Sequence, residues 1–142
     1  MEQAMNQIVP IASFPIFITE KLQLAKAFYT ENFGFDVAFE NDWYVHLFTQ
    51  SGVQIGFLMP DHLSQSEYFH EAFSGNGAIF TLEVENVDTA HLAAKVRGLK
   101  MLSPVKAEEW GQKHFVIEDP SGVKIDVVQS TEPTDEYKQD YR

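Results

Sequence analysis

An acidic residue lies inside an otherwise apolar segment near the end of the chain. Residues 123–129 read VKIDVVQ, and in a strand Asp126 would point away from the apolar row that begins at Val123. A carboxylate on such a face must find a partner or take up a proton. Asp126 could therefore anchor a cationic or hydroxylated ligand, form an ion pair with Lys124 on the same strand face, or bind a metal ion.

Four further side chains could contribute to a ligand site. Trp110 could stack on a flat or cationic ligand, or it could cap the edge of the core. His114, four residues later, could donate a hydrogen bond to the same ligand. His46 stands between two apolar residues, which favours a satisfied strand histidine over a catalytic base. Glu83 either faces the ligand or forms a salt bridge at the rim of its site.

Several other chemistries are disfavoured by the sequence. There are no cysteines, which excludes disulfides, thiolate catalysis and Cys-ligated zinc. Neither a Gly-rich phosphate loop nor a Ser-His-Asp order is present. His62, Glu67 and His70 have spacing that a metal could use, but a surface helix with acids and histidines needs no ion, so we expect none there.

The segment around Asp126 is a predicted hairpin. Asp119-Pro-Ser-Gly122 has Asp first, Pro second and Gly fourth, which are the preferences of a type I turn. Residues 114–118 and 123–129 flank the turn and are rich in apolar and β-branched residues. We therefore predict two antiparallel strands joined by this turn.

The rest of the chain reads as two halves with the order β-α-β-β-β. In each half a strand precedes an amphipathic helix, and the helix ends at a glycine, Gly34 or Gly98, with Asp88 as the expected N-cap of the second helix. The predicted strands are 14–19, 35–40, 43–49 and 53–59 in the first half and 78–85, 99–102 and the closing hairpin in the second, with helices over 22–33 and from Asp88 to Gly98.

The two halves are predicted to form a single domain over residues 1–130. Its first module covers about 13–60 and its second about 77–129. In the connector, 61–76, Leu63, Tyr68 and Phe69 could form a short amphipathic helix that serves as a lid or as an outer linker. Residues 131–142 are expected to be a loosely attached polar tail.

Charge and composition narrow the partners. The formal net charge is −11, and such a surface repels phosphate backbones, so no nucleic acid partner is expected. The same charge either favours cationic ligands or serves solubility. No run is apolar enough to span a bilayer, and the N-terminus lacks a secretory signal, so we expect a cytoplasmic protein without a membrane partner.

The paired halves, the helix sequence LAKAFYTENFGF and the ending F-x-x-x-DPSG-x-x-I-D together resemble the vicinal oxygen chelate superfamily. That superfamily includes glyoxalase I, bleomycin-resistance proteins and extradiol dioxygenases, and the likeness covers about residues 13–129. The resemblance implies an α+β fold in which two βαβββ modules form a curved mixed sheet cup around a ligand.

The resemblance also locates the metal-ligand positions of the superfamily. Its metal-dependent members take one ligand from the first and one from the last strand of each module, which corresponds here to Phe14, Gly56, Ile79 and Asp126. Of these four only Asp126 can bind a metal, and a shift by two residues does not rebuild a site. A catalytic metal generally needs three protein ligands, so we expect no cofactor.

An apolar cup floor formed by Phe14, Ile16, Ile18 and Ile79 would suit a planar or aliphatic molecule. By resemblance to the bleomycin-resistance branch, we expect a homodimer that sequesters a small organic ligand, cationic or aromatic, in a role such as antibiotic resistance. The alternative is a metal-dependent lyase, isomerase or dioxygenase in which Asp126 is joined by His46, His114 or Glu83. A degenerate module with a regulatory or interaction role is the third hypothesis.

Overall fold

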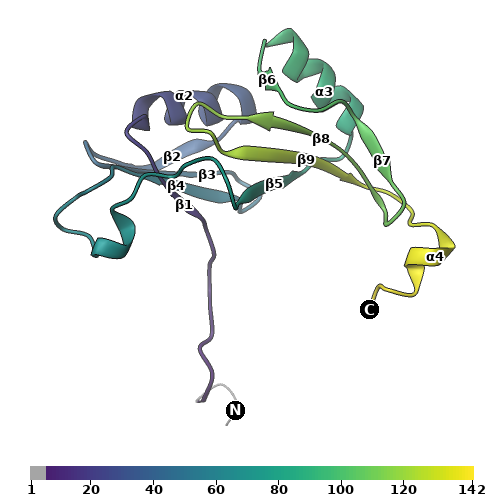
Figure 1. Ribbon diagram of the computed structural model, residues 1–142, viewed down its shortest axis with the longest axis horizontal. Coiled ribbons are helices and arrows are strands. Elements are labelled where there is room, and N and C mark those ends of the chain that lie inside the picture. Colours follow the sequence, from purple (N-terminus) through teal and green to yellow (C-terminus); the bar gives the residue numbers. More distant parts are fainter. Residues whose placement is uncertain (1–5) are drawn as a thin grey trace. The chain divides into compact units, whose positions relative to one another are not determined.

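Two units of similar plan make up the chain in the computed structural model, which describes residues 6–142 (Figure 1). The first unit covers residues 1–72 and the second covers residues 73–142. The division therefore falls within the segment 61–76 that the sequence predicts as a connector. Each unit combines helix with a mixed sheet, which confirms the predicted α+β class.

The first unit is a four-stranded sheet with one long helix. Across the sheet the strands follow the order β1, β4, β3, β2; the β1–β4 pair is parallel and the other two pairs are antiparallel. The elements are β1 (Ile16–Ile18), α2 (Leu22–Phe33), β2 (Asp36–Glu40), β3 (Tyr44–Phe48) and β4 (Gln54–Leu58).

Helix α2 packs on one face of this sheet. Its residues Leu22, Ala25 and Tyr29 are buried and recur at helical spacing, so they form the apolar stripe that faces the strands. The ring of Tyr29 lies 5.5 Å from those of Phe35 and Phe57, centroid to centroid. Because side chains alternate along a strand, the residues next to the core positions point to the opposite face, which α2 leaves open.

The second unit repeats this plan with additional short strands. Its sheet has the order β5, β9, β8, β6, with β7 also paired to β8, and the β5–β9 pair is parallel. Helix α3 packs against β8 and β9. The elements are β5 (Ile79–Glu83), α3 (Val87–Val96), β6 (Lys100–Met101), β7 (Lys106–Glu108), β8 (Gln112–Glu118), β9 (Lys124–Ser130) and α4 (Asp135–Lys138).

The start of α3 differs from the prediction. Asn86, not Asp88, is the N-cap: its side-chain oxygen accepts a hydrogen bond from the amide of Thr89 at 3.0 Å. Asp88 lies in the first turn, where its charge favours the helix dipole. Among residues 6–142, no helix is both long and apolar enough to cross a bilayer.

The amphipathic helix predicted in the connector does not form. A single 3₁₀ turn, Glu67–Phe69, stands there, and Leu63 and Tyr68 are almost fully exposed. Leu63 and Tyr68 therefore do not supply the apolar face that a helix would need.

The tail is more structured than its composition suggests. It contains α4, and the amide of Thr134 donates to the carbonyl of Glu109 at 2.9 Å. The hydroxyl of Tyr141 donates to the carbonyl of Trp110. The tail is thus bonded to the loop between β7 and β8.

The predicted hairpin is present and is held by the side chain that opens its turn. Asp119 is 4% exposed, and its Oδ1 accepts hydrogen bonds from the amides of Ser121 at 2.8 Å and Val123 at 2.9 Å. The amide of Gly122 closes the turn on the carbonyl of Asp119. These bonds fix the register between β8 and β9, in which Val116 pairs with Asp126.

We predict that Asp119→Ala lowers the free energy of unfolding by about 1–3 kcal/mol, because one buried and one partly buried amide lose their acceptor. Asp119→Asn keeps an acceptor oxygen and is the matched control, with a smaller loss expected. Urea unfolding of both variants measures this. Equal losses would show that the charge of Asp119, and not its acceptor geometry, stabilises the hairpin.

Candidate functional site

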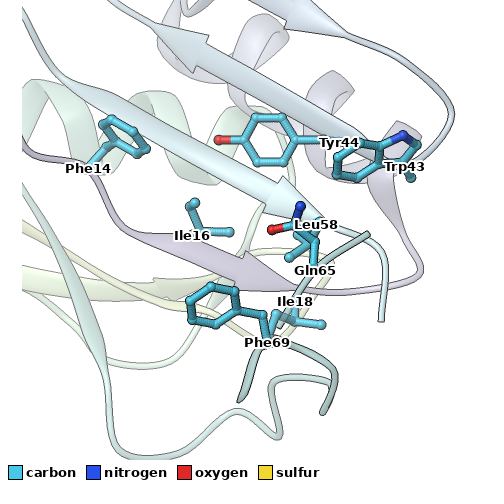
Figure 2. Close-up of a pocket in the computed structure, with 8 residues that line it drawn as sticks. All are labelled: Phe14, Ile16, Ile18, Trp43, Tyr44, Leu58, Gln65 and Phe69. Carbon is cyan, nitrogen blue, oxygen red and sulfur yellow. The ribbon is translucent and has the colours of Figure 1, made fainter. Parts of the chain in front are cut away.

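An apolar cavity lies on the open sheet face of the first unit (Figure 2). Its volume is about 430 Å³. Ile16, Ile18 and Leu58 form its floor on β1 and β4, and the register places Tyr44 opposite Leu58 on β3. The residues that line it are Phe14, Ile16, Ile18, Trp43, Tyr44, Leu58, Gln65 and Phe69.

The connector contributes one wall of this cavity. Gln65 and Phe69 line it, although Phe69 is half-exposed. The base of the loop is closed by the amide of Asp61, which donates to the carbonyl of His70 at 3.1 Å, and a ring nitrogen of His70 bonds the carbonyl of Gln65 at 2.8 Å. These two bonds close the loop on itself.

The loop also packs on the sheet side of the cavity through an aromatic stack. The ring of His62 lies 4.1 Å from that of Trp43 and nearly parallel to it. His62 and His70 are thus engaged in local contacts and do not form the metal set that their spacing with Glu67 allows.

Gly56 makes room for the hydroxyl of Tyr44 on the cavity face. A β-carbon at residue 56 would overlap the Tyr44 hydroxyl oxygen and would lie 2.9 Å from its Cζ and 3.1 Å from Cγ1 of Ile16. Gly56 is buried in the middle of β4, where a glycine weakens a strand unless another group needs its space. Here that group is the Tyr44 phenol.

Tyr44 begins a polar chain that runs across the strands. Its hydroxyl lies 2.7 Å from Nδ1 of His46, and Nε2 of His46 lies 2.7 Å from Oε1 of Gln54. The ring of Phe14 meets the His46 ring edge-on at 4.5 Å. Burial raises the pKa of Tyr44 above its ordinary value of 10, so the phenol stays neutral.

In the second unit the structure brings together two of the predicted site residues. Nδ1 of His114 lies 2.7 Å from Oδ1 of Asp126, and its Nε2 lies 2.9 Å from Oε2 of Glu108. The hydrogen bond with Glu108 is the main cause that raises the pKa of His114, with a further contribution from Asp126. The same bond lowers the pKa of Glu108, which also pairs with Lys106.

Of the alternatives for Asp126, the ion pair with Lys124 does not form. Lys124 instead bonds Glu118 at 2.6 Å, and Lys100 bonds the other oxygen of the same carboxylate. The hydrogen bonds from Lys100 and Lys124 lower the pKa of Glu118 to about 2. The open face of this sheet therefore carries ion pairs where the first unit carries aromatic rings.

The remaining predicted residues belong to the second unit and are not among the residues that line the aromatic cavity. Ile79 is 70% exposed and borders a shallow hollow with Gly75 and Lys124. Glu83 is exposed on the same strand face. Trp110 donates its ring N–H to Gln112, and its ring packs edge-on against Tyr137 of the tail.

At the positions that the resemblance aligns with the superfamily's metal ligands, only Asp126 has a side-chain donor. In the first unit Gly56 pairs with Ile16, and in the second Asp126 pairs with Thr81. The position of Gly56 is occupied by the Tyr44 phenol, and the Asp126 carboxylate is engaged by His114. Within residues 6–142 no group of three His, Cys, Asp or Glu side chains has the arrangement that a metal needs.

Several cavity residues escape the sequence interpretation. Tyr44, Trp43, Gln65 and Phe69 are absent from the predicted set. The available signal is the alternation of Tyr44 and His46 on one strand with a glycine on the next. It becomes visible only when the register pairs His46 with Gly56.

Comparison with protein-family models identifies the superfamily of the chain. The family model for the Glyoxalase/Bleomycin resistance protein/Dioxygenase superfamily matches residues 7–127, and the chain belongs to this superfamily. Comparison with curated proteins gave no match.

Solved structures share the fold at low sequence identity. A glyoxalase/bleomycin resistance protein/dioxygenase from Nocardioides is 19% identical with a TM-score of 0.74, over 92% of this chain and 91% of that one. An enzyme of the same family from Burkholderia phytofirmans PsJN is 22% identical with a TM-score of 0.70, over 83% and 97%. Lactoylglutathione lyase from Agrobacterium tumefaciens is 16% identical with a TM-score of 0.68, over 84% and 94%.

We predict a pH-dependent contribution of His114 to stability. Its pKa in the folded chain is raised above the ordinary 6.5, so its protonated form stabilises the fold below that pH, and this contribution is lost as the pH rises through the folded-state pKa. His114→Gln should therefore cost more stability at about pH 5.5 than at about pH 9. Urea unfolding at both pH values measures the difference.

His91 offers a matched control, because its ring packs edge-on against Phe115 and not between carboxylates. The difference in stability loss between the two pH values should be larger for His114→Gln than for His91→Gln. Equal losses for His114→Gln at the two pH values would contradict the role of the two carboxylates.

Proposed function

We propose that the chain binds an apolar, planar small molecule in the cavity of the first unit without a metal ion and acts by sequestration. The observation that carries this proposal is the cavity of about 430 Å³ lined by aromatic and aliphatic side chains. Its size and lining are typical of ligand sites, which are mostly apolar with a few polar groups.

Metal independence is supported by the position of Gly56. By resemblance, chelating members of the superfamily carry a metal ligand there, whereas here the Tyr44 phenol fills the space. A bound molecule would meet a hydroxyl and ring faces on this wall. Sequestration of a drug or metabolite requires affinity alone and no reacting group.

The alternative, a metal-dependent lyase, isomerase or dioxygenase, has less support. It needs Asp126 joined by His46, His114 or Glu83, and of these His114 does lie within hydrogen-bond distance of Asp126. However, both ring nitrogens of His114 already bond carboxylates, so neither is directed toward an open coordination position. Neither Glu83 nor His46, which could supply a third metal ligand, is among the contacts of Asp126 and His114.

A substitution that fills the cavity should abolish binding. We predict that Ile16→Trp lowers the affinity for a planar aromatic probe, 9-aminoacridine, by about tenfold or more, because the indole occupies the floor. Ile16 is 45% exposed, so the fold should tolerate the change. Titration followed by acridine fluorescence measures the affinity.

Val96→Trp supplies the control for this substitution. Val96 lies on α3 and is 80% exposed, so it adds the same ring at a residue that does not line the cavity. Its affinity should equal that of the natural chain. If Ile16→Trp binds the probe as tightly as the natural chain does, the binding site lies elsewhere.

Metal removal should leave binding unchanged. We predict equal affinity for 9-aminoacridine after dialysis against a chelator and after addition of Zn²⁺, Ni²⁺ or Mn²⁺, because the cavity offers rings and a phenol in place of metal ligands. Isothermal titration under each condition measures this. Affinity that appears only with a metal would favour the enzyme hypothesis.

A further inference from the structure

We infer that the cavity selects planar aromatic ligands that carry an amino group, because the Tyr44 hydroxyl is oriented as a hydrogen-bond acceptor. This inference rests on the proposed binding function and adds the chemistry of the ligand. The residues that set the direction are His46 and Gln54, which position Tyr44 and do not line the cavity themselves.

The direction of the hydrogen-bond chain follows from its far end. The oxygen Oε1 of Gln54 can accept but cannot donate, so Nε2 of His46, 2.7 Å away, must carry the proton. In a neutral imidazole the other nitrogen then accepts. Nδ1 of His46 therefore accepts the proton of the Tyr44 hydroxyl, also at 2.7 Å.

Because the Tyr44 hydroxyl donates its proton to His46, its oxygen can only accept a hydrogen bond from a ligand. A ligand amine or ammonium can donate to it, whereas a carboxylate or carbonyl oxygen would face it acceptor to acceptor. Figure 2 shows the hydroxyl of Tyr44 pointing along the cavity toward Phe14, above Ile16. A hydrogen bond beside these apolar side chains meets less competition from water than one on an open polar surface, which strengthens it.

Gly56 is the residue that permits this arrangement. Any β-carbon at that position would displace the Tyr44 hydroxyl from the cavity wall. Gly56 thereby acts as a specificity determinant without contacting the ligand through a side chain.

The surroundings favour a cationic amine in particular. The first unit, residues 1–72, has nine acidic residues against two lysines in its sequence. Asp42 and Glu67 stand beside or near the lining residues Trp43 and Phe69 in the chain. Aromatic faces such as that of Trp43 attract cations as well, so charge and hydrogen bonding select the same group.

Three acridines of nearly equal shape separate these effects. The compounds are 9-aminoacridine with a donor and a positive charge, 9-methylacridine with neither, and acridine-9-carboxylate with an acceptor and a negative charge. We expect the amino compound to bind about tenfold more tightly than the methyl compound, and the carboxylate to bind most weakly. High salt screens the general attraction of the acidic surface and should leave the part due to the hydrogen bond.

Tyr44→Phe isolates the hydroxyl while it keeps the ring. We expect the amino compound to lose about tenfold in affinity and the methyl compound to be unaffected. Tyr68→Phe is the matched control, because Tyr68 is 85% exposed in the connector and outside the cavity lining. Its affinities for all three compounds should match those of the natural chain.

His46→Leu tests the positioning role. It removes the internal acceptor, so the Tyr44 hydroxyl becomes free to donate, and the carboxylate should gain affinity relative to the methyl compound. A purely structural effect would change the three affinities together and leave their ratios constant. Thermal melting of each variant establishes that it is folded.

The outcomes distinguish this inference from the proposed function. Tight binding of all three acridines in the cavity with equal affinity, or an equal loss with Tyr44→Phe, would overturn the inference and leave the binding function standing. A preference for the carboxylate would show that the hydrogen-bond chain runs the other way and would also overturn it. Failure of the natural chain to bind any of the three would overturn both.

Discussion

The fit of one phenol against one glycine organises the open face of the first unit. Tyr44 on β3 and Gly56 on β4 lie on adjacent strands, and the hydroxyl occupies the volume that a side chain at residue 56 would fill. The hydrogen bond to His46 holds the phenol there. A side chain at residue 56 would change the shape and the polarity of the cavity wall. The position of the Tyr44 ring and the exposure of its oxygen both require that residue 56 has no β-carbon.

The same sheet plan carries different chemistry in each unit. On the open face of the first unit, aromatic and aliphatic side chains surround a short hydrogen-bond chain. On the corresponding face of the second unit, Glu118 bonds two lysines and His114 bonds two carboxylates. The charged groups of the second unit largely pair with one another. The cavity of the first unit instead exposes apolar side chains, which an organic ligand can cover.

The sequence predicted what is local and missed what depends on pairing between strands. The helix 22–33, the left-handed Gly34 and the Asp-Pro-Ser-Gly turn follow from spacing and turn chemistry within a few residues, and the structure confirms them. His114 was not foreseen as the partner of Asp126, because Lys124 is close in sequence while His114 becomes close only through the β8–β9 register. Tyr44 was missed for the same reason, since its importance rests on a glycine twelve positions later.

The space above a buried glycine in a strand can be empty, which leaves the strand poorly packed, or it can be filled by another side chain. Telling these two cases apart helps to recognise a ligand site. β4 has the sequence QIGFL, in which Gly56 interrupts a row that faces the cavity. If the space above it were empty, the glycine would cost the strand backbone entropy and packing with no return. Since the Tyr44 hydroxyl fills that space and bonds His46, the loss is offset by a hydrogen-bonded, half-buried polar group. The glycine is therefore best understood as part of the wall of the cavity.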